Sequence, residues 1–326
     1  STNNVNDMLL NSATIGTFSF GAGAKNSVLV RSDKYGIQIN KDISSILGST
    51  GNVFAQATKT GKILNNAVLN STLGGFTGLL SSGTTGASVE NKGTVQITGT
   101  GNNNVGMAVL DTSTGSNSGT IKVLGTGNNK SGIYNTGTFT ISNGSNIEVT
   151  GESSSGIYNS NAVNISGTVA LKGTGGTTGI YSDGGTITST SENNLSIVID
   201  DTSNPVTKGL AIYAEGGANV TLGAAKIEVK NGAAGVAAFG AATSISLIGS
   251  ELKYSGEGYA AYSDGNGKID LSGATVILGG SSTAFDLNLG ATSPITLDSN
   301  SRIHVESNDV VVFNLKNATG LNTNNL

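Results

Sequence analysis

The sequence of 326 residues has no cysteine and no tryptophan, only two prolines and a single histidine. Without cysteine the chain has no disulfide framework and no thiolate metal site, and one histidine alone makes a zinc site unexpected. No apolar run approaches the roughly 18 residues of a membrane-spanning helix. Proline is scarce in the way expected of a stacked sheet, in which nearly every backbone N–H must donate a hydrogen bond.

The chain also has no large excess of charge of either sign. The chain has 17 basic and 21 acidic residues, for a net charge of −4. Residues 1–163 hold nine basic and seven acidic residues (+2), and residues 164–326 hold eight and fourteen (−6). Nucleic-acid binding needs clustered Lys and Arg, and the only arginines are Arg31 and Arg302. The composition therefore predicts no nucleic-acid partner.

Glycine is abundant, with 49 residues, and it accompanies alternating Val, Ile and Thr rather than proline, which favours order over disorder. The main feature is a recurring aromatic residue after a small or apolar one. The steps between successive aromatics are 24, 23, 32, 26, 23, 23 and 28 residues. A period in the twenties indicates one supersecondary unit stacked on copies of itself. The aromatics are Tyr134, Tyr158, Tyr181, Tyr213, Phe239, Tyr262, Phe285 and Phe313.

One repeat can be followed through residues 137–159. Alternating residues predict strands over 138–141, 146–149 and 156–159, separated by turns over 143–145 and 151–155. Three strands and three turns per coil predict an all-β, three-sided parallel β-helix of ten to twelve coils, about 50 Å long at 4.8 Å per coil. The predicted interior residues of this repeat are Phe139, Ile141, Ile147 and Val149.

Neighbouring residues of a strand face opposite sides, so Ile157 of Gly-Ile-Tyr-Asn is expected inside and Tyr158 outside, in a stack of rings. Asn135 and Asn159 follow two such tyrosines and predict an amide ladder between coils. Upstream, weaker marks stand at Phe54, at Gly78-Leu79-Leu80 and at Gly106-Met107-Ala108. Residues 1–27 are predicted to be an irregular or capping segment, and residues 28–326 the β-helix.

The step of 32 residues from Tyr181 to Tyr213 predicts one longer coil. Its extra residues are expected in a surface loop at residues 200–208. Insertions in solenoids map to surface loops and sometimes to binding faces. The sequence therefore predicts Asp200, Asp201, Asn204 and Lys208 as candidate ligand-binding residues.

Parallel β-helices also host polysaccharide-cleaving enzymes, so the same rod could carry catalytic carboxylates. Asp183, Glu215 and Asp264 each stand two positions after an aromatic mark, so the first two are expected to lie side by side on adjacent coils. Ala241 is expected to interrupt this ladder in the coil before Asp264.

The single histidine, His304, is expected on one outer strand face with Arg302 and Glu306. No Ser-His-Asp spacing and no Ca²⁺-binding glycine-rich nonapeptide is present. The sequence predicts no catalytic, cofactor or metal site, and hence a protein that is not an enzyme.

Gly-Ile-Tyr-Asn at 132–135 and 156–159, Gly-Ile-Tyr-Ser at 179–182 and strands of the type Gly-Thr-Ile-x-Val carry a family resemblance. With the lack of cysteine and the Asn/Thr/Gly/Ser-rich turns, the chain resembles a passenger-domain fragment of a type V autotransporter outer-membrane adhesin, in particular the fusobacterial ones. The resemblance covers roughly residues 50–315. It implies a right-handed helix, export through an outer-membrane barrel of a longer parent chain, and display on the cell surface.

The resulting functional hypothesis is a monomeric adhesin rod that holds binding loops away from the outer membrane. Its expected partners are host or bacterial cell-surface proteins or glycans. Three alternatives stay open: a polysaccharide-active enzyme, a purely structural stalk and a toxin passenger. The toxin reading would require an apolar or amphipathic segment, which the sequence does not contain.

Overall fold

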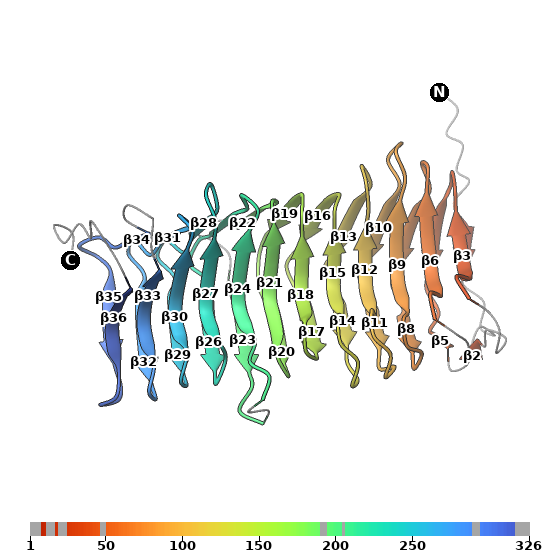
Figure 1. Ribbon diagram of the computed structural model, residues 1–326. Coiled ribbons are helices and arrows are strands. Elements are labelled where there is room, and N and C mark those ends of the chain that lie inside the picture. Colours follow the sequence, from red (N-terminus) through yellow and green to blue (C-terminus); the bar gives the residue numbers. More distant parts are fainter. Residues whose placement is uncertain are drawn as a thin grey trace.

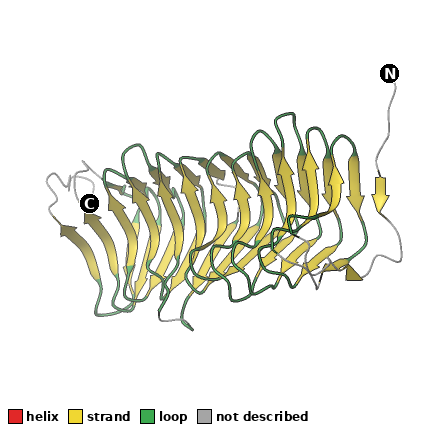
Figure 2. Ribbon diagram, turned by 45° about the vertical axis from the view of Figure 1, so that its right-hand side comes forward, coloured by secondary structure: helices red, strands yellow, loops and turns green. Residues whose placement is uncertain are grey.

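The computed structural model describes residues 8–10, 17–18, 25–45, 50–189, 194–203, 206–288 and 294–316. Over these residues the chain forms strands and turns and no helix, in three parallel sheets of twelve strands each. Successive strands pass from one sheet to the next, and each strand pairs with those three earlier and three later in the chain. The fold is the predicted three-sided parallel β-helix, and twelve strands per sheet agree with ten to twelve coils. Figures 1 and 2 show the coils following one another from the N-terminal to the C-terminal end of the rod.

The strands are named by sheet in chain order. Sheet A consists of β1 (Met8–Leu10), β4 (Gly36–Ile39), β7 (Lys62–Asn65), β10 (Ser88–Asn91), β13 (Thr114–Asn117), β16 (Thr138–Ile141), β19 (Ala162–Ile165), β22 (Thr186–Ser189), β25 (Asn219–Leu222), β28 (Ser244–Ser246), β31 (Lys268–Asp270) and β34 (Ile295–Thr296).

Sheet B consists of β2 (Thr17–Phe18), β5 (Ile43–Ser45), β8 (Val68–Ser71), β11 (Thr94–Ile97), β14 (Thr120–Val123), β17 (Ser145–Thr150), β20 (Val169–Thr174), β23 (Leu195–Asp200), β26 (Lys226–Lys230), β29 (Glu251–Ser255), β32 (Thr275–Gly279) and β35 (Arg302–Val305).

Sheet C consists of β3 (Val28–Ser32), β6 (Val53–Thr58), β9 (Thr77–Ser82), β12 (Val105–Val109), β15 (Ser131–Asn135), β18 (Ser154–Asn159), β21 (Thr177–Asp183), β24 (Leu210–Glu215), β27 (Ala234–Phe239), β30 (Tyr259–Asp264), β33 (Thr283–Asn288) and β36 (Val311–Lys316). These are the twelve strands that stand side by side along the rod in Figure 1.

The segment 1–27, predicted to be irregular or capping, contains two of these strands. β1 pairs with β4, with Met8 opposite Ile37, and β2 pairs with β5, with Thr17 opposite Ser44. Apart from these strands and residues 25–27, the segment lies outside the described residues. Sheets A and B therefore begin before residue 28.

The interior of the rod is a continuous column of aliphatic and aromatic side chains. Phe139, Ile141, Ile147 and Val149 are all fully buried, as predicted, and so is Ile157. Burying a side chain of this size completely contributes about 1.5–3 kcal/mol relative to leaving it exposed. Repeated over every coil, this apolar column holds the three sheets together.

The glycine of the Gly-Ile-Tyr motif is explained by a close approach between coils. A Cβ atom on Gly132 would lie 2.6 Å from the carbonyl oxygen of Gly156, and one on Gly156 would lie 2.6 Å from the carbonyl oxygen of Gly179. The corresponding residue of the next coil, Ala211, is also small. Contacts this short force even an alanine to shift the backbone, so the column keeps the smallest residues.

Register corrects three of the predicted aromatic marks. Phe285 pairs with Ala261 and is fully buried, so it lies in the inward isoleucine column and not in the outward tyrosine column. Phe313 follows it, opposite Phe285. Upstream, Gln56 and not Phe54 pairs with Leu80 in the outward column, and Phe54 is buried. A slip of one residue in a strand reverses the side that a side chain faces, which explains Phe285 and Phe313. Phe54 is instead opposite Gly78, at the position where the strand places a second residue inward.

Buried amides form ladders between coils. Asn135 Nδ2 donates to Asn159 Oδ1 at 2.8 Å, which confirms the predicted ladder. A second ladder, in sheet A, was not predicted: Asn65 donates to Asn91 at 2.8 Å and Asn91 to Asn117 at 2.7 Å. All five side chains are fully buried. Because a buried amide without a partner costs about 1–3 kcal/mol, these ladders make neighbouring coils depend on each other.

Tyr254, on β29, is a polar residue in the apolar interior. Its side chain is fully buried, and its hydroxyl donates to the carbonyl oxygen of Gly232 at 2.6 Å. Burial raises the pKa of the phenol to about 12. A Cβ atom on Gly258 would lie 2.3 Å from the Tyr254 hydroxyl, so the glycine makes room for it.

We expect Tyr254→Phe to lower the free energy of unfolding by about 1–3 kcal/mol, because the Gly232 carbonyl is left buried and unpaired. Tyr254→Ala should cost about 3–5 kcal/mol, since it also opens a cavity. Denaturant unfolding measures both changes, with Tyr134→Phe on the outer face as the control of nearly unchanged stability. If Tyr254→Phe is as stable as the wild type, the buried hydrogen bond from Tyr254 to Gly232 does not stabilise the fold.

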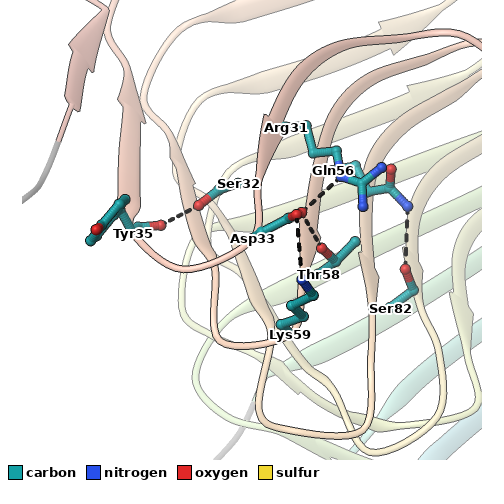
Figure 3. Close-up of polar contacts among 8 residues, drawn as sticks. All are labelled: Arg31, Ser32, Asp33, Tyr35, Gln56, Thr58, Lys59 and Ser82. Atoms are coloured by element: carbon teal, nitrogen blue, oxygen red, sulfur yellow. Dashed lines mark hydrogen bonds and ion pairs between the residues drawn. The ribbon is translucent and has the colours of Figure 1, made fainter.

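An exposed turn between β3 and β4 is fastened to the next coil through Asp33 (Figure 3). Its Oδ1 accepts hydrogen bonds from Thr58 Oγ1 and from Arg31 Nε, the latter at 2.7 Å, and Lys59 Nζ lies 3.9 Å from Oδ2. The Thr58 hydrogen bond, followed by the Arg31 hydrogen bond, lowers the pKa of Asp33 below its ordinary value. The same close-up shows Gln56 donating to Ser82, one coil further on, at 3.3 Å.

Because the folded pKa of Asp33 lies below its unfolded value, its stabilising effect is present above the unfolded pKa and is lost as pH falls through the folded pKa. We expect Thr58→Val to raise the pKa of Asp33 toward the ordinary value of about 3.9. Carboxyl NMR titration measures this shift directly. Asp33→Asn should make the melting temperature fall less as the pH is lowered, because this carboxylate can no longer be protonated. If the variant and the wild type lose melting temperature equally at low pH, the contacts of Asp33 do not stabilise the fold.

Candidate ligand-binding groove on sheet C

The tyrosines of the repeat form a column of rings on the outer face of sheet C. Tyr134, Tyr158, Tyr181 and Tyr213 pair in register on β15, β18, β21 and β24 and are half-buried. The predicted positions, with isoleucine inside and tyrosine outside, are confirmed. Their ring centroids are 4.8, 5.2 and 5.1 Å apart in that order along the rod.

Phe239 extends the column in an unexpected way. The residue in register with Tyr213 is Ala237, and Phe239 occupies the position opposite Asp264, where Ala241 was predicted. Its ring nevertheless lies between those of Tyr213 and Tyr262, at centroid distances of 5.0 and 5.3 Å. The small side chain of Ala237 leaves room for this ring, so the aromatic column stays continuous.

A second column of side chains runs parallel to the rings. Each strand places two successive residues inward, as shown by Gly132, whose Cβ would lie 2.7 Å from Ile147 Cγ2, and by the buried Ile133. The strand bends there, so the residue before the glycine faces outward with the tyrosine. This second column consists of Ser131, Ser155, Thr178 and Leu210.

Between the two columns lies a groove of about 400 Å³ that spans four coils. Its walls are the four tyrosines on one side and Ser131, Ser155, Thr178 and Leu210 on the other. Ser131 Oγ and Ser155 Oγ lie 3.3 Å apart across neighbouring coils. The serine and threonine wall was not predicted, although the sequence contains a signal for it: each of these residues stands three positions before a tyrosine of the repeat.

Glu215 fixes two of the rings. It accepts a hydrogen bond from the Tyr181 hydroxyl on one carboxylate oxygen and from the Tyr213 hydroxyl, at 3.0 Å, on the other. Burial and then the bond to Glu215 raise the pKa of Tyr213 to about 12 and that of Tyr181 further in the same direction. Burial also raises the pKa of Tyr158. The phenols of Tyr158, Tyr181 and Tyr213 are therefore neutral hydrogen-bonding groups at physiological pH.

The one lysine that lines the groove is itself buried. Lys130 is 1% exposed, and its Nζ donates to the carbonyl oxygen of Gly125 at 2.6 Å. Desolvation lowers its pKa to about 8. One coil earlier, the Asn104 side-chain amide bonds the matching carbonyl, that of Gly99, at 3.1 Å. Lys130 thus bonds a turn carbonyl in the same way as Asn104 does. Its ammonium group is buried and does not expose a charge in the groove.

The predicted long coil is confirmed at the predicted place. Val169 pairs with Leu195, a step of 26 residues, whereas Thr178 pairs with Leu210, a step of 32, so six additional residues lie between β23 and β24. In Figure 1 this connection projects beyond the neighbouring turns. It leads directly into Leu210, at the edge of the groove.

Each described residue of the predicted loop site has a partner on the rod. Asp201 is fully buried, and its carboxylate accepts hydrogen bonds from the backbone N–H groups of Gly176 and Gly209. Asp200 Oδ2 lies 3.6 Å from Lys230 Nζ, and Lys208 Nζ lies 3.7 Å from Glu257 Oε2. Asn204 lies outside the described residues. These contacts fasten the loop, and ligand binding by its residues stays a prediction.

The loop also borders a second hollow, of about 410 Å³, beside the turns of the preceding coils. Val206 and Thr207 line it together with Glu152, and Val206 is 88% exposed. Asn128 lines this hollow while Asn129 lines the groove, so one column of turns separates the two.

The residues considered for catalysis lie largely as expected. Asp183 and Glu215 are register partners on β21 and β24, so the predicted adjacency is confirmed. Both oxygens of Glu215 already accept phenol hydrogen bonds, as described above. Arg302, His304 and Glu306 are all exposed, in agreement with the predicted outer face. Among the described residues, no three His, Cys, Asp or Glu side chains are grouped so that they could hold a metal ion.

No protein-family model, curated protein or solved structure matches this chain. The likeness to autotransporter passengers therefore rests on the sequence motifs. Within the described residues there is also no helix long and apolar enough to cross a membrane.

The groove makes a spectroscopic prediction. In Glu215→Gln the pKa of Tyr213 should fall from about 12, because the charged acceptor is lost, but it should stay above an ordinary tyrosine since burial remains. Absorbance titration of phenolate formation, compared between wild type, Glu215→Gln and Tyr213→Phe, measures this. Identical curves for the wild type and Glu215→Gln would show that the carboxylate does not hold the phenols.

Proposed function

We propose that this chain is the binding rod of a cell-surface adhesin of the autotransporter passenger type, and that it contacts its ligand through the tyrosine groove of sheet C. The observation that carries this proposal is the groove itself: four outward tyrosines in register across four coils, opposite a wall of hydroxyl groups. Tyrosine offers a large contact area together with a polar end, and it is enriched where proteins bind one another.

The architecture supports display of such a surface. Each coil is bonded to its neighbours along the whole rod, and buried side chains fill the interior. Contacts between successive coils make a solenoid stiff and elongated, which suits a spacer that holds a binding surface away from a membrane. Export through an outer-membrane barrel of a longer parent chain and display on the outer membrane are parts of the same proposal.

The loop at residues 200–208 is kept as a neighbouring contact region. It precedes Leu210 of the groove and exposes Val206 beside the second hollow. A ligand longer than the groove would reach this loop.

The test is binding of the purified protein to bacterial and host cells. We expect Tyr158→Ala combined with Tyr181→Ala to reduce cell binding at least tenfold with little change in melting temperature, because both rings lie on the outer face. Thr140→Ala, a half-buried threonine of β16 in sheet A, is the matched control and should bind as the wild type does.

Other outcomes separate the alternatives. If the double variant binds cells as well as the wild type does, the binding surface lies elsewhere. If the wild type itself binds no cells, a structural stalk is favoured. Turnover of a polysaccharide that is lost in Asp183→Asn would favour an enzyme instead.

A further inference from the structure

The rings of the groove are not equivalent, and the difference lies in their orientation. Tyr134 and Tyr158 are stacked with an angle of 6° between their planes. At a centroid distance of 4.8 Å, parallel rings must face each other along the rod axis, because coplanar rings at that distance would overlap. The faces of these two rings are therefore turned along the column, and each covers one face of the other.

Tyr181 is turned across the column. Its ring plane lies at 89° to that of Tyr158 on one side and at 89° to that of Tyr213 on the other. Since Tyr158 presents a face along the axis, Tyr181 presents its edge to Tyr158 and turns both of its own faces away from its column neighbours. Tyr181 lines the groove, and neither of its faces is covered by a ring of the column, so a face of this ring is available to a ligand lying there.

Glu215 anchors the hydroxyl end of this ring. Its carboxylate accepts the hydroxyl protons of Tyr181 and Tyr213 together, which ties the far end of the Tyr181 ring to the next coil. Because the hydroxyl oxygen lies on the axis about which a tyrosine ring turns, this charge-assisted bond fixes where the end of the ring lies, while packing against Tyr158 and Tyr213 sets the angle of its plane. Glu215 is therefore a positioning residue for the groove.

The groove exposes no charged side chain, which argues against an ion pair with a cationic or an anionic ligand. The only ionisable lysine lining it is Lys130, whose buried ammonium group bonds the Gly125 carbonyl. Asp183 and Glu215 do not line the groove, and Glu215 is occupied by the two phenols. Neither a strong cation site nor a strong anion site results from this arrangement.

The backbone of sheet C offers nothing to an extended peptide. Strand-addition binding needs a free sheet edge. Within the groove, each of β15, β18 and β21 pairs with a strand on both sides, so their backbone groups are already used along the rod axis. What the groove offers is an aromatic face of Tyr181 and a row of hydroxyl-bearing residues, Ser131, Ser155 and Thr178, of which the two serines are 8% and 6% exposed.

We propose that the groove binds a neutral carbohydrate chain, with one pyranose ring lying on the face of Tyr181 and with Glu215 anchoring the hydroxyl end of the Tyr181 side chain. The C–H bonds on one side of a pyranose carry slight positive charge and fit the negative face of an aromatic ring. Its hydroxyl groups both donate and accept, as do Ser131, Ser155 and Thr178. A groove across four coils, about 14 Å at 4.8 Å per step, suits a chain of several sugars.

This inference rests on the proposed function and names the ligand class of the same groove. The experiment is NMR titration of the intact protein with neutral tetrasaccharides of β-linked glucose, galactose and N-acetylglucosamine. We expect at least one of them to bind, with the C–H protons of one sugar shifted upfield because they lie over an aromatic face. Tetramethylammonium and an uncharged extended peptide serve as competing probes.

Variants distinguish the contact made by Tyr181 from the positioning role of Glu215. Tyr181→Ala should weaken binding at least tenfold and abolish the upfield shift, whereas Tyr262→Ala, in the same column but outside the groove, should change neither. Glu215→Ala should weaken binding several-fold and reduce the upfield shift, and Glu215→Gln, which still accepts a hydrogen bond, should restore part of both. A purely structural effect of Glu215 would lower the melting temperature while leaving the upfield shift of bound sugar unchanged.

Failure of this inference is distinguishable from failure of the adhesin proposal. If the tyrosine variants abolish cell binding but no tetrasaccharide binds, or if periodate oxidation of the cell-surface sugars leaves cell binding intact, the carbohydrate assignment is wrong and the adhesin proposal stands. Binding of tetramethylammonium or of the peptide in the groove, in place of sugar, overturns the carbohydrate assignment as well. Cell binding that ignores the tyrosines overturns both proposals.

Discussion

Parallel pairing between coils is the interaction on which the rest of this structure depends. Each strand donates to and accepts from the equivalent strands of the neighbouring coils, so whatever one coil places at a position is repeated one strand spacing away. The backbones come so close at the column of Gly132 and Gly156 that there is hardly room for a Cβ atom. The motif Gly-Ile-Tyr follows from that contact, with the small residue at the close approach, the isoleucine in the core and the tyrosine outside.

The same repetition builds the groove. A tyrosine on one coil is an ordinary surface residue, but four in register form a wall, and the residues three positions earlier form the opposite wall. Polar groups inside the rod are matched in the same way, through the ladder of Asn65, Asn91 and Asn117 and through Lys130 in the role of Asn104. These amide and ammonium groups are tolerated inside the rod because the next coil, or the adjacent turn, supplies a partner.

Breaks in the repetition are where function is proposed. The six additional residues before Leu210 place a loop beside the groove, and Tyr181, anchored by Glu215, departs from the stacked orientation of Tyr134 and Tyr158. A uniform stack of rings would cover every inner ring on both faces. The departure at Tyr181 is what leaves an aromatic surface open in the groove.

The sequence alone determined the architecture, because period and alternation are local properties: the three-sided helix, the inward Ile157, the outward Tyr158, the Asn135–Asn159 ladder and the long coil near residue 200 were all predictable. It did not determine register where the repeat drifts. Phe239 and Phe285 follow the same kind of small residue, yet one packs outside and the other inside, because pairing with the preceding coil decides which side each faces. Only the tertiary structure brought Glu215 to the two phenols and buried Lys130 at the Gly125 carbonyl, since those contacts depend on how coils and turns pack, which spacing along the chain does not encode.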